Sequence, residues 1–64
     1  MKIEHLILIS ASILMVYYIG EKCYQYAIIF GDGSIYQPDE IYYTAEKALK
    51  LGRQNIEFLH NYLL

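Results

Sequence analysis

The feature that most constrains this chain is a stretch of 14 residues without charge, from Leu6 to Ile19. A helix rises about 1.5 Å per residue and the hydrocarbon layer of a membrane is about 30 Å thick, so a spanning helix needs about 20 apolar residues. The stretch reaches that length only when Ile3 is counted. Glu4, His5, Tyr17 and Tyr18 must then lie at the lipid–water interfaces. On this basis, the favoured interpretation is an N-terminal transmembrane helix.

Two other interpretations of the stretch stay open. A cleaved signal peptide fits Lys2 and the apolar core, but Tyr18 stands where the peptidase requires a small residue. A pair of strands broken near Ser10 to Ser12 would instead belong to a soluble fold, since Ile, Val and Tyr favour strands. A chain of 64 residues would then need a partner or a second copy to hide so much apolar surface.

Composition shifts near Gly20, which divides the chain in two. Residues 1–20 are the apolar segment, interpreted as a single-pass membrane anchor. Residues 21–64 carry most of the charge and have the composition of an ordinary folded unit.

The second segment begins with a predicted β-hairpin. Residues 24–30 alternate in side-chain character, as a strand does. Asp32-Gly33 then predicts a two-residue type I′ turn, which requires positive φ at both central residues. This turn predicts two cross-strand pairs: Phe30 with Ile35, and Ile29 with Tyr36.

A helix is predicted after Thr44, whose hydroxyl is a suitable N-cap. Apolar residues follow at spacings of three and four, which places them on one helical face: Ala45, Ala48, Leu49, Gly52, Ile56, Leu59 and Leu63. Glycine costs a helix about 1 kcal/mol relative to alanine. Gly52 on the apolar face therefore predicts a close approach between helix and sheet.

Together these patterns predict an α+β fold. An N-terminal apolar, transmembrane helix is followed by a small β-hairpin and a C-terminal amphipathic helix, which together form a ββα unit. A tyrosine-rich hairpin followed by a helix that opens Thr44-Ala45-Glu46-Lys47-Ala48 is similar to the small ββα halves of HicB-like antitoxins. The resemblance is to the order of elements and implies the same ββα arrangement.

No constellation of residues predicts catalysis, so an enzyme is not expected. Cys23 is the only cysteine, and His5 and His60 lie at opposite ends of the chain, so no metal or cofactor site is predicted. A cysteine–histidine nucleophile would need an acid partner and an oxyanion site that no motif marks. The formal charge of −2 disfavours nucleic acid as a partner, because binding to phosphates relies on lysine and arginine.

Eight tyrosines are the one compositional excess. Tyrosine is favoured in protein interfaces, because it supplies a large contact area at little entropic cost. It is also simply a good strand residue. Five tyrosines of the second segment are the candidate partner-binding residues: Tyr24, Tyr26, Tyr36, Tyr42 and Tyr43.

The resulting functional hypothesis is a non-enzymatic, membrane-anchored accessory or regulatory protein whose tyrosine-rich ββα part binds a protein partner. The alternative is a soluble, cytoplasmic α+β protein-binding module, an inhibitor or antitoxin-like protein. In that alternative the chain forms a homodimer and keeps its N-terminal segment in the core.

Overall fold

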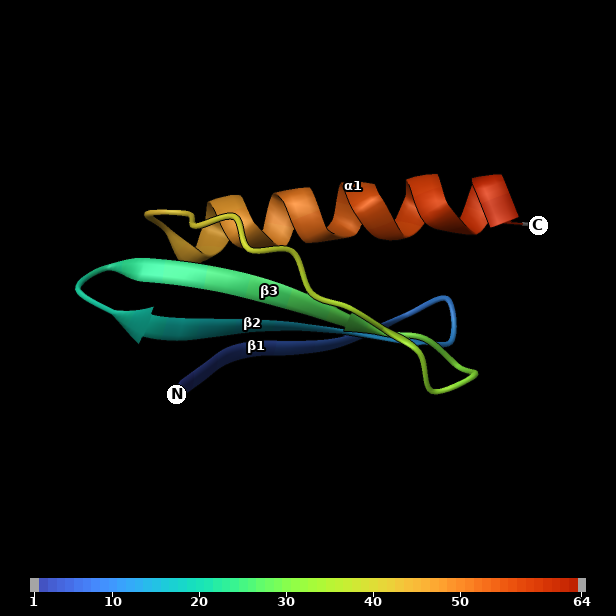
Figure 1. Cartoon of the computed structure of the whole chain (residues 1–64), viewed down its shortest axis with the longest axis horizontal. Coiled ribbons are helices and arrows are strands. Elements are labelled where there is room, and N and C mark those ends of the chain that lie inside the picture. Colours follow the sequence, from blue (N-terminus) through green and yellow to red (C-terminus); the bar gives the residue numbers. More distant parts are fainter. Residues whose placement is uncertain (1, 64) are drawn as a thin grey trace.

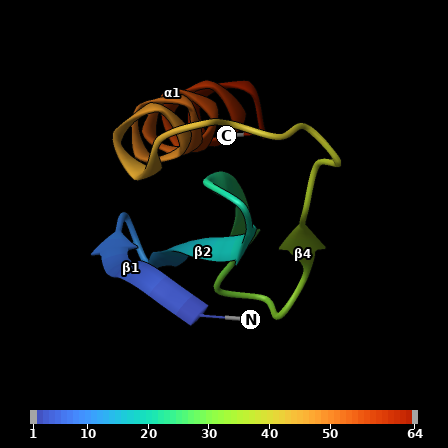
Figure 2. The ribbon, with the colours of Figure 1, turned by 90° about the vertical axis from the view of Figure 1, so that its left-hand side faces the viewer.

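The computed structural model describes residues 2–63, with the side chains of residues 2–59, as an antiparallel sheet with one helix on one face (Figure 1). The strands lie side by side in chain order: β1 (Lys2–Ile9), β2 (Ser12–Gly20), β3 (Cys23–Ile29) and β4 (Ile35–Tyr36). The helix, α1 (Ala45–Leu63), runs along the strands. Figure 2 shows the segment between β4 and α1 passing along one side of the molecule, with β1 at the opposite side.

The predicted N-terminal transmembrane helix is wrong, because the uncharged stretch forms β1, a tight turn and β2. The two strands pair from Leu6 with Met15 to Ile9 with Ser12. Ile, Val and Tyr pack well on a pleated surface, and an apolar run carries no periodicity that separates a buried strand from a helix. Among the described residues no helix is both long and apolar enough to cross a membrane. The interpretation of residues 1–20 as a membrane-spanning helix is therefore wrong as well.

Two tight turns join the first three strands, and both use residues other than glycine at positive φ. Ser10 and Ala11, at φ 49° and 64°, connect β1 to β2, and Glu21 and Lys22, at φ 49° and 60°, connect β2 to β3. Positive φ at both central residues is the type I′ geometry, whose twist matches that of the paired strands. The left-handed conformation costs an L-residue roughly 1–2 kcal/mol, so strand pairing must offset strain in both turns.

The loop between β3 and β4 is one residue longer than the predicted two-residue turn. The Gly33 amide donates to the Phe30 carbonyl (2.9 Å) and the Phe30 amide donates to the Ser34 carbonyl (2.9 Å), so the loop holds three residues. In this loop only Gly33 has positive φ (92°), as in a type I turn followed by a glycine bulge. The predicted pairs are therefore wrong; the observed pairs are Ile29 with Ile35 and Ile28 with Tyr36.

This shift of one residue decides which faces the residues of β4 occupy, because neighbouring strand residues point to opposite sides. Ile35 joins the face that points away from α1. Tyr36 joins the face of Tyr26, and their ring centroids lie 6.4 Å apart. The Asp32 carboxylate fixes the loop by accepting from the amide and hydroxyl of Ser34, at 2.9 and 2.6 Å.

The predicted helix is confirmed in its start and in its close approach to the sheet. The Lys47 amide donates to Thr44 Oγ1 (3.1 Å), so Thr44 caps α1. Gly52 is buried against β2, and a Cβ at this position would lie 2.5 Å from Leu14 Cδ1. The helix can come this close only where it carries no side chain. The predicted apolar position Leu63 lies outside the residues whose side chains are described.

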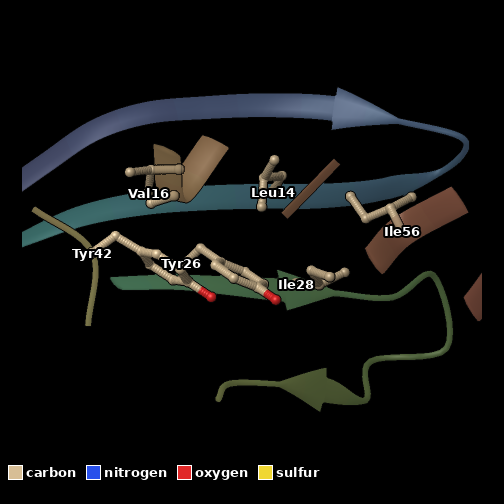
Figure 3. Close-up of a cluster of buried hydrophobic side chains, with 7 residues drawn as sticks. Leu14, Val16, Tyr26, Ile28, Tyr42 and Ile56 are labelled. Atoms are coloured by element: carbon tan, nitrogen blue, oxygen red, sulfur yellow. The ribbon is translucent and has the colours of Figure 1, made fainter. Parts of the chain in front are cut away.

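The core lies between α1 and one face of the sheet (Figure 3). Its buried side chains come from β2, β3 and α1: Leu14, Val16, Tyr26, Ile28, Ala48 and Ile56. Tyr42 reaches this core from the segment between β4 and α1. Two backbone hydrogen bonds hold it there, from the Tyr24 amide to the Tyr42 carbonyl (2.7 Å) and from the Tyr42 amide to the Tyr24 carbonyl (2.8 Å). This bridge extends the edge of β3 beyond the short β4.

The strain in the first turn predicts a stabilising substitution. Replacing Ser10-Ala11 with Asn-Gly should raise the free energy of unfolding by about 1 kcal/mol, because both residues tolerate positive φ. Urea unfolding followed by circular dichroism, at one fixed protein concentration, measures the effect. The matched control places Asn-Gly at Arg53-Gln54, exposed in α1 where φ is negative, and should lower stability by about 1 kcal/mol. Equal effects at the two places would contradict the assignment of strain.

The contact between Gly52 and Leu14 predicts that Gly52→Ala destabilises the protein by about 1 kcal/mol. Alanine gains about 1 kcal/mol of helix propensity, but overpacking costs about 1–3 kcal/mol. In a Leu14→Val background, which lacks the Cδ atoms that the new methyl would meet, Gly52→Ala should instead stabilise. Urea unfolding of the four proteins measures the coupling. The same effect of Gly52→Ala in both backgrounds would show that the contact carries no strain.

Candidate protein-interaction surface

The face of the sheet opposite α1 is covered by apolar side chains in register. One row crosses all four strands: Leu8, Ile13, Ile29 and Ile35. A second row is Leu6, Met15 and Ala27, and a third is Ile3, Tyr17 and Gln25. We call these three rows the open face, because the described chain places no helix or strand against them (Figures 1 and 2).

The open face is exposed where it is most aliphatic. The exposed fractions are 74% for Leu8, 63% for Leu6, 63% for Ile35, 49% for Ile3 and 36% for Ile13. None of the described residues in the three rows carries a charge. The nearby charges lie at the edge and in the turns, for example in the pair of Lys2 Nζ and Glu4 Oε1, which are 3.9 Å apart. The open face is therefore a continuous apolar surface with a charged border.

A polar network closes one end of the open face. The Tyr17 hydroxyl donates to Gln25 Oε1 (3.3 Å) and accepts from Gln37 Nε2 (2.7 Å). Gln25 Nε2 also donates to the backbone carbonyl of Asp39 (3.1 Å). These bonds tie the segment after β4 to β2 and β3, and they leave Tyr17 only 3% exposed. Tyr17 and Gln25 of the third row are thus polar and covered, and Ala27 of the second row is buried as well (2% exposed). The open part of the face consists of Ile3, Leu6, Leu8, Ile13 and Ile35.

The five candidate tyrosines do not form one surface. Tyr26 and Tyr42 belong to the core, where their rings stack with centroids 6.0 Å apart. Tyr24 is half-buried and meets Tyr18 edge to face at 5.5 Å. Tyr36 and Tyr43 are exposed, by 39% and 76%. The two buried rings have a structural role in the core, and the partner-binding role expected of this group stays a prediction.

The buried phenols lie in an environment that keeps them protonated. Burial raises the pKa of Tyr26 to about 12, although the hydrogen bond that Asn55 Nδ2 donates to its hydroxyl acts in the opposite direction. Burial also raises the pKa of Tyr42, and the Glu40 carboxylate adds to this effect. The Tyr42 hydroxyl lies near Tyr26 and Glu40, but it meets no hydrogen-bond partner with good geometry in the described part of the chain. Neither phenol therefore supplies a base near neutral pH.

The remaining chemical groups do not gather at one place. Cys23 is a half-buried free thiol, and its Sγ donates weakly to the Glu21 carbonyl at 3.5 Å. Within the residues that the structure describes, no group of three or more His, Cys, Asp or Glu side chains is placed to hold a metal ion. The side chain of His60 lies outside those residues.

Sequence reasoning missed the open face because it depends on the register of the sheet. The sequence nevertheless carried a signal for this surface, namely the uninterrupted apolar character of Leu6 to Ile19. If this stretch forms strands, apolar side chains lie on both faces of the sheet. The strand interpretation had therefore already required a partner or a second copy. What the sequence left undecided is which residues would be covered by α1 and which would stay open.

No protein-family model matches the chain, and neither the curated proteins nor the solved structures contain a match.

The raised pKa of Tyr26 predicts a loss of stability at alkaline pH. Tyrosine in the unfolded chain ionises near pH 10, whereas Tyr26 in the folded protein ionises only near 12. The folded state keeps a proton that the unfolded state releases, so the free energy of unfolding falls as pH rises from 10 towards 12. Urea unfolding at about pH 9 and about pH 11.5 measures the decrease.

The control for this titration is a pair of phenylalanine variants. Tyr26→Phe should make the alkaline decrease smaller, at a cost near neutral pH of about 1 kcal/mol for the lost hydrogen bond with Asn55. Tyr43→Phe, at an exposed position, should leave the decrease unchanged. An equal decrease in the wild type and in Tyr26→Phe would contradict the role of this phenol.

Proposed function

We propose that the chain is a non-enzymatic protein-binding module and that the open face is its binding surface. The observation that carries the proposal is the aliphatic row that crosses all four strands, in which Leu8, Ile13 and Ile35 are exposed and Ile29 is half-buried. Scattered exposed apolar residues are normal on a protein surface, but contiguous apolar patches mark places where another molecule binds.

Water covers the exposed aliphatic side chains of this face until another molecule displaces it. Moving apolar surface out of water is worth about 25 cal/mol per Å², so an occupant that covers Leu6, Leu8 and Ile13 gains stability from each of them. The strand backbone below them is already paired in the sheet and needs no rearrangement. A rigid surface loses little conformational entropy on binding, and this favours association.

The surroundings of the open face favour a protein as the occupant. Protein interfaces typically have an apolar centre and a polar rim. Here the first two rows supply the centre, and the Tyr17–Gln25–Gln37 network and the Lys2–Glu4 pair lie at the border. The hydroxyl and amides of the border offer hydrogen bonds that fix the orientation of a partner.

Site-specific photo-crosslinking in cells tests the proposal. The photoreactive residue p-benzoyl-phenylalanine at position 8 should form crosslinks to a protein, whereas the same residue at Arg53, on the exposed side of α1, should form few. Adding Leu6→Glu to the position-8 variant should reduce the crosslinks at least about 10-fold, because burying an unpaired charge is costly.

Two results would contradict the open face as the binding surface. One is equal crosslinking from positions 8 and 53. The other is crosslinking from Tyr43 with none from position 8, which would favour the exposed tyrosines in its place. Circular dichroism of each variant confirms that the fold is retained.

A further inference from the structure

We infer that the occupant of the open face is a second copy of this chain, packed face to face about a two-fold axis. The inference rests on the proposed binding function and names its partner. Two sheets would meet through their open faces at a spacing of about 10 Å, and the two helices would lie on the outside. The product is a four-layer homodimer with a second apolar core between the sheets.

The chemistry of the open face suits self-association. In a two-fold interface a patch meets the same patch, so any charge at its centre would face a like charge. The chain carries a formal charge of −2, yet none of the described residues in the three rows is charged. Two copies can therefore approach through this face without placing like charges together at its centre.

The area of the open face is sufficient for a small dimer. The accessible apolar surface of five exposed side chains is on the order of 400 Å² per copy, or about 800 Å² for two copies. These side chains are Ile3, Leu6, Leu8, Ile13 and Ile35. The half-buried Met15 and Ile29 and the backbone around them bring the total to about 1,000 Å². This is near the lower limit for a specific interface, so we expect a dimer of moderate affinity.

The edge of the sheet is a less suitable interface than its face. Strand β1 is an edge strand, and regular pairing along it would require an uninterrupted ladder. The register shifts between Ile3 and His5, which leaves Glu4 as an extra residue, and Lys2 pairs with Glu4 at the same place. A bulge and charges of this kind protect an edge from adding another strand.

Sedimentation equilibrium of the purified full chain, from about 5 to about 500 µM, tests the inference. The wild type should reach a mass twice the 7.5 kDa of one chain. Leu8→Glu should raise the dissociation constant at least about 100-fold, because each dimer then buries two unpaired charges. The matched control is Gln54→Glu, which adds the same charge at an exposed position of α1, on the other side of the sheet, and should change the constant by less than about 3-fold.

A second variant protects the test against loss of the fold. Leu6→Thr keeps a residue that favours strands and should raise the dissociation constant about 10-fold without a new charge. Circular dichroism at a concentration where the wild type is a monomer confirms that the chain is folded. A dimer unaffected by both Leu8→Glu and Leu6→Thr would overturn the inference.

The remaining outcomes separate this inference from the proposed function. A wild type that stays monomeric while position 8 crosslinks to another protein overturns the homodimer and keeps the binding function. A monomer without crosslinks overturns both. Association that grows beyond the dimer would point to edge pairing, and binding to phosphatidylcholine vesicles that Leu8→Glu abolishes would point to lipid. Either of these two results overturns the inference.

Discussion

The whole structure follows from the pairing of two strands that are apolar on both sides. Alternate residues of a strand point to opposite faces. The uncharged stretch therefore sends Leu14 and Val16 to one face and Leu6, Leu8 and Ile13 to the other. One helix can cover one face only. The position of α1, the composition of the core and the existence of the open face all follow from this limit.

The elements with local signals were predictable from the sequence. Thr44 and the spacing of Ala48, Gly52 and Ile56 identified the start and the apolar face of α1, since capping and helical periodicity depend on near neighbours. The close approach at Gly52 was predictable for the same reason. Tyr24, Tyr26 and Tyr36 were correctly placed in the strands of the hairpin, but their separation between core and surface depends on the register.

The elements without local signals were not predictable in the same way. The turn at Ser10-Ala11 lacks glycine and asparagine, so nothing in its sequence distinguished a hairpin from a continuous helix. The register of β4 depends on whether Gly33 closes a two-residue or a three-residue loop, and Asp-Gly is compatible with both. A one-residue error there exchanges Ile35 and Tyr36 between the two faces, whereas Leu6, Leu8 and Ile13 were missed because the stretch that contains them was predicted as a helix.

The order of the elements along the chain also has a consequence for synthesis. Neighbours in the sheet are neighbours in sequence throughout, so the sheet forms without a long-range closure step. The first hairpin leaves the ribosome before α1 has been made, because α1 begins only at Ala45. During that interval Leu14 and Val16 are uncovered as well, and the nascent hairpin exposes both of its apolar faces to chaperones. When α1 docks, it covers the face that carries Leu14 and Val16. The open face remains uncovered in the single folded chain.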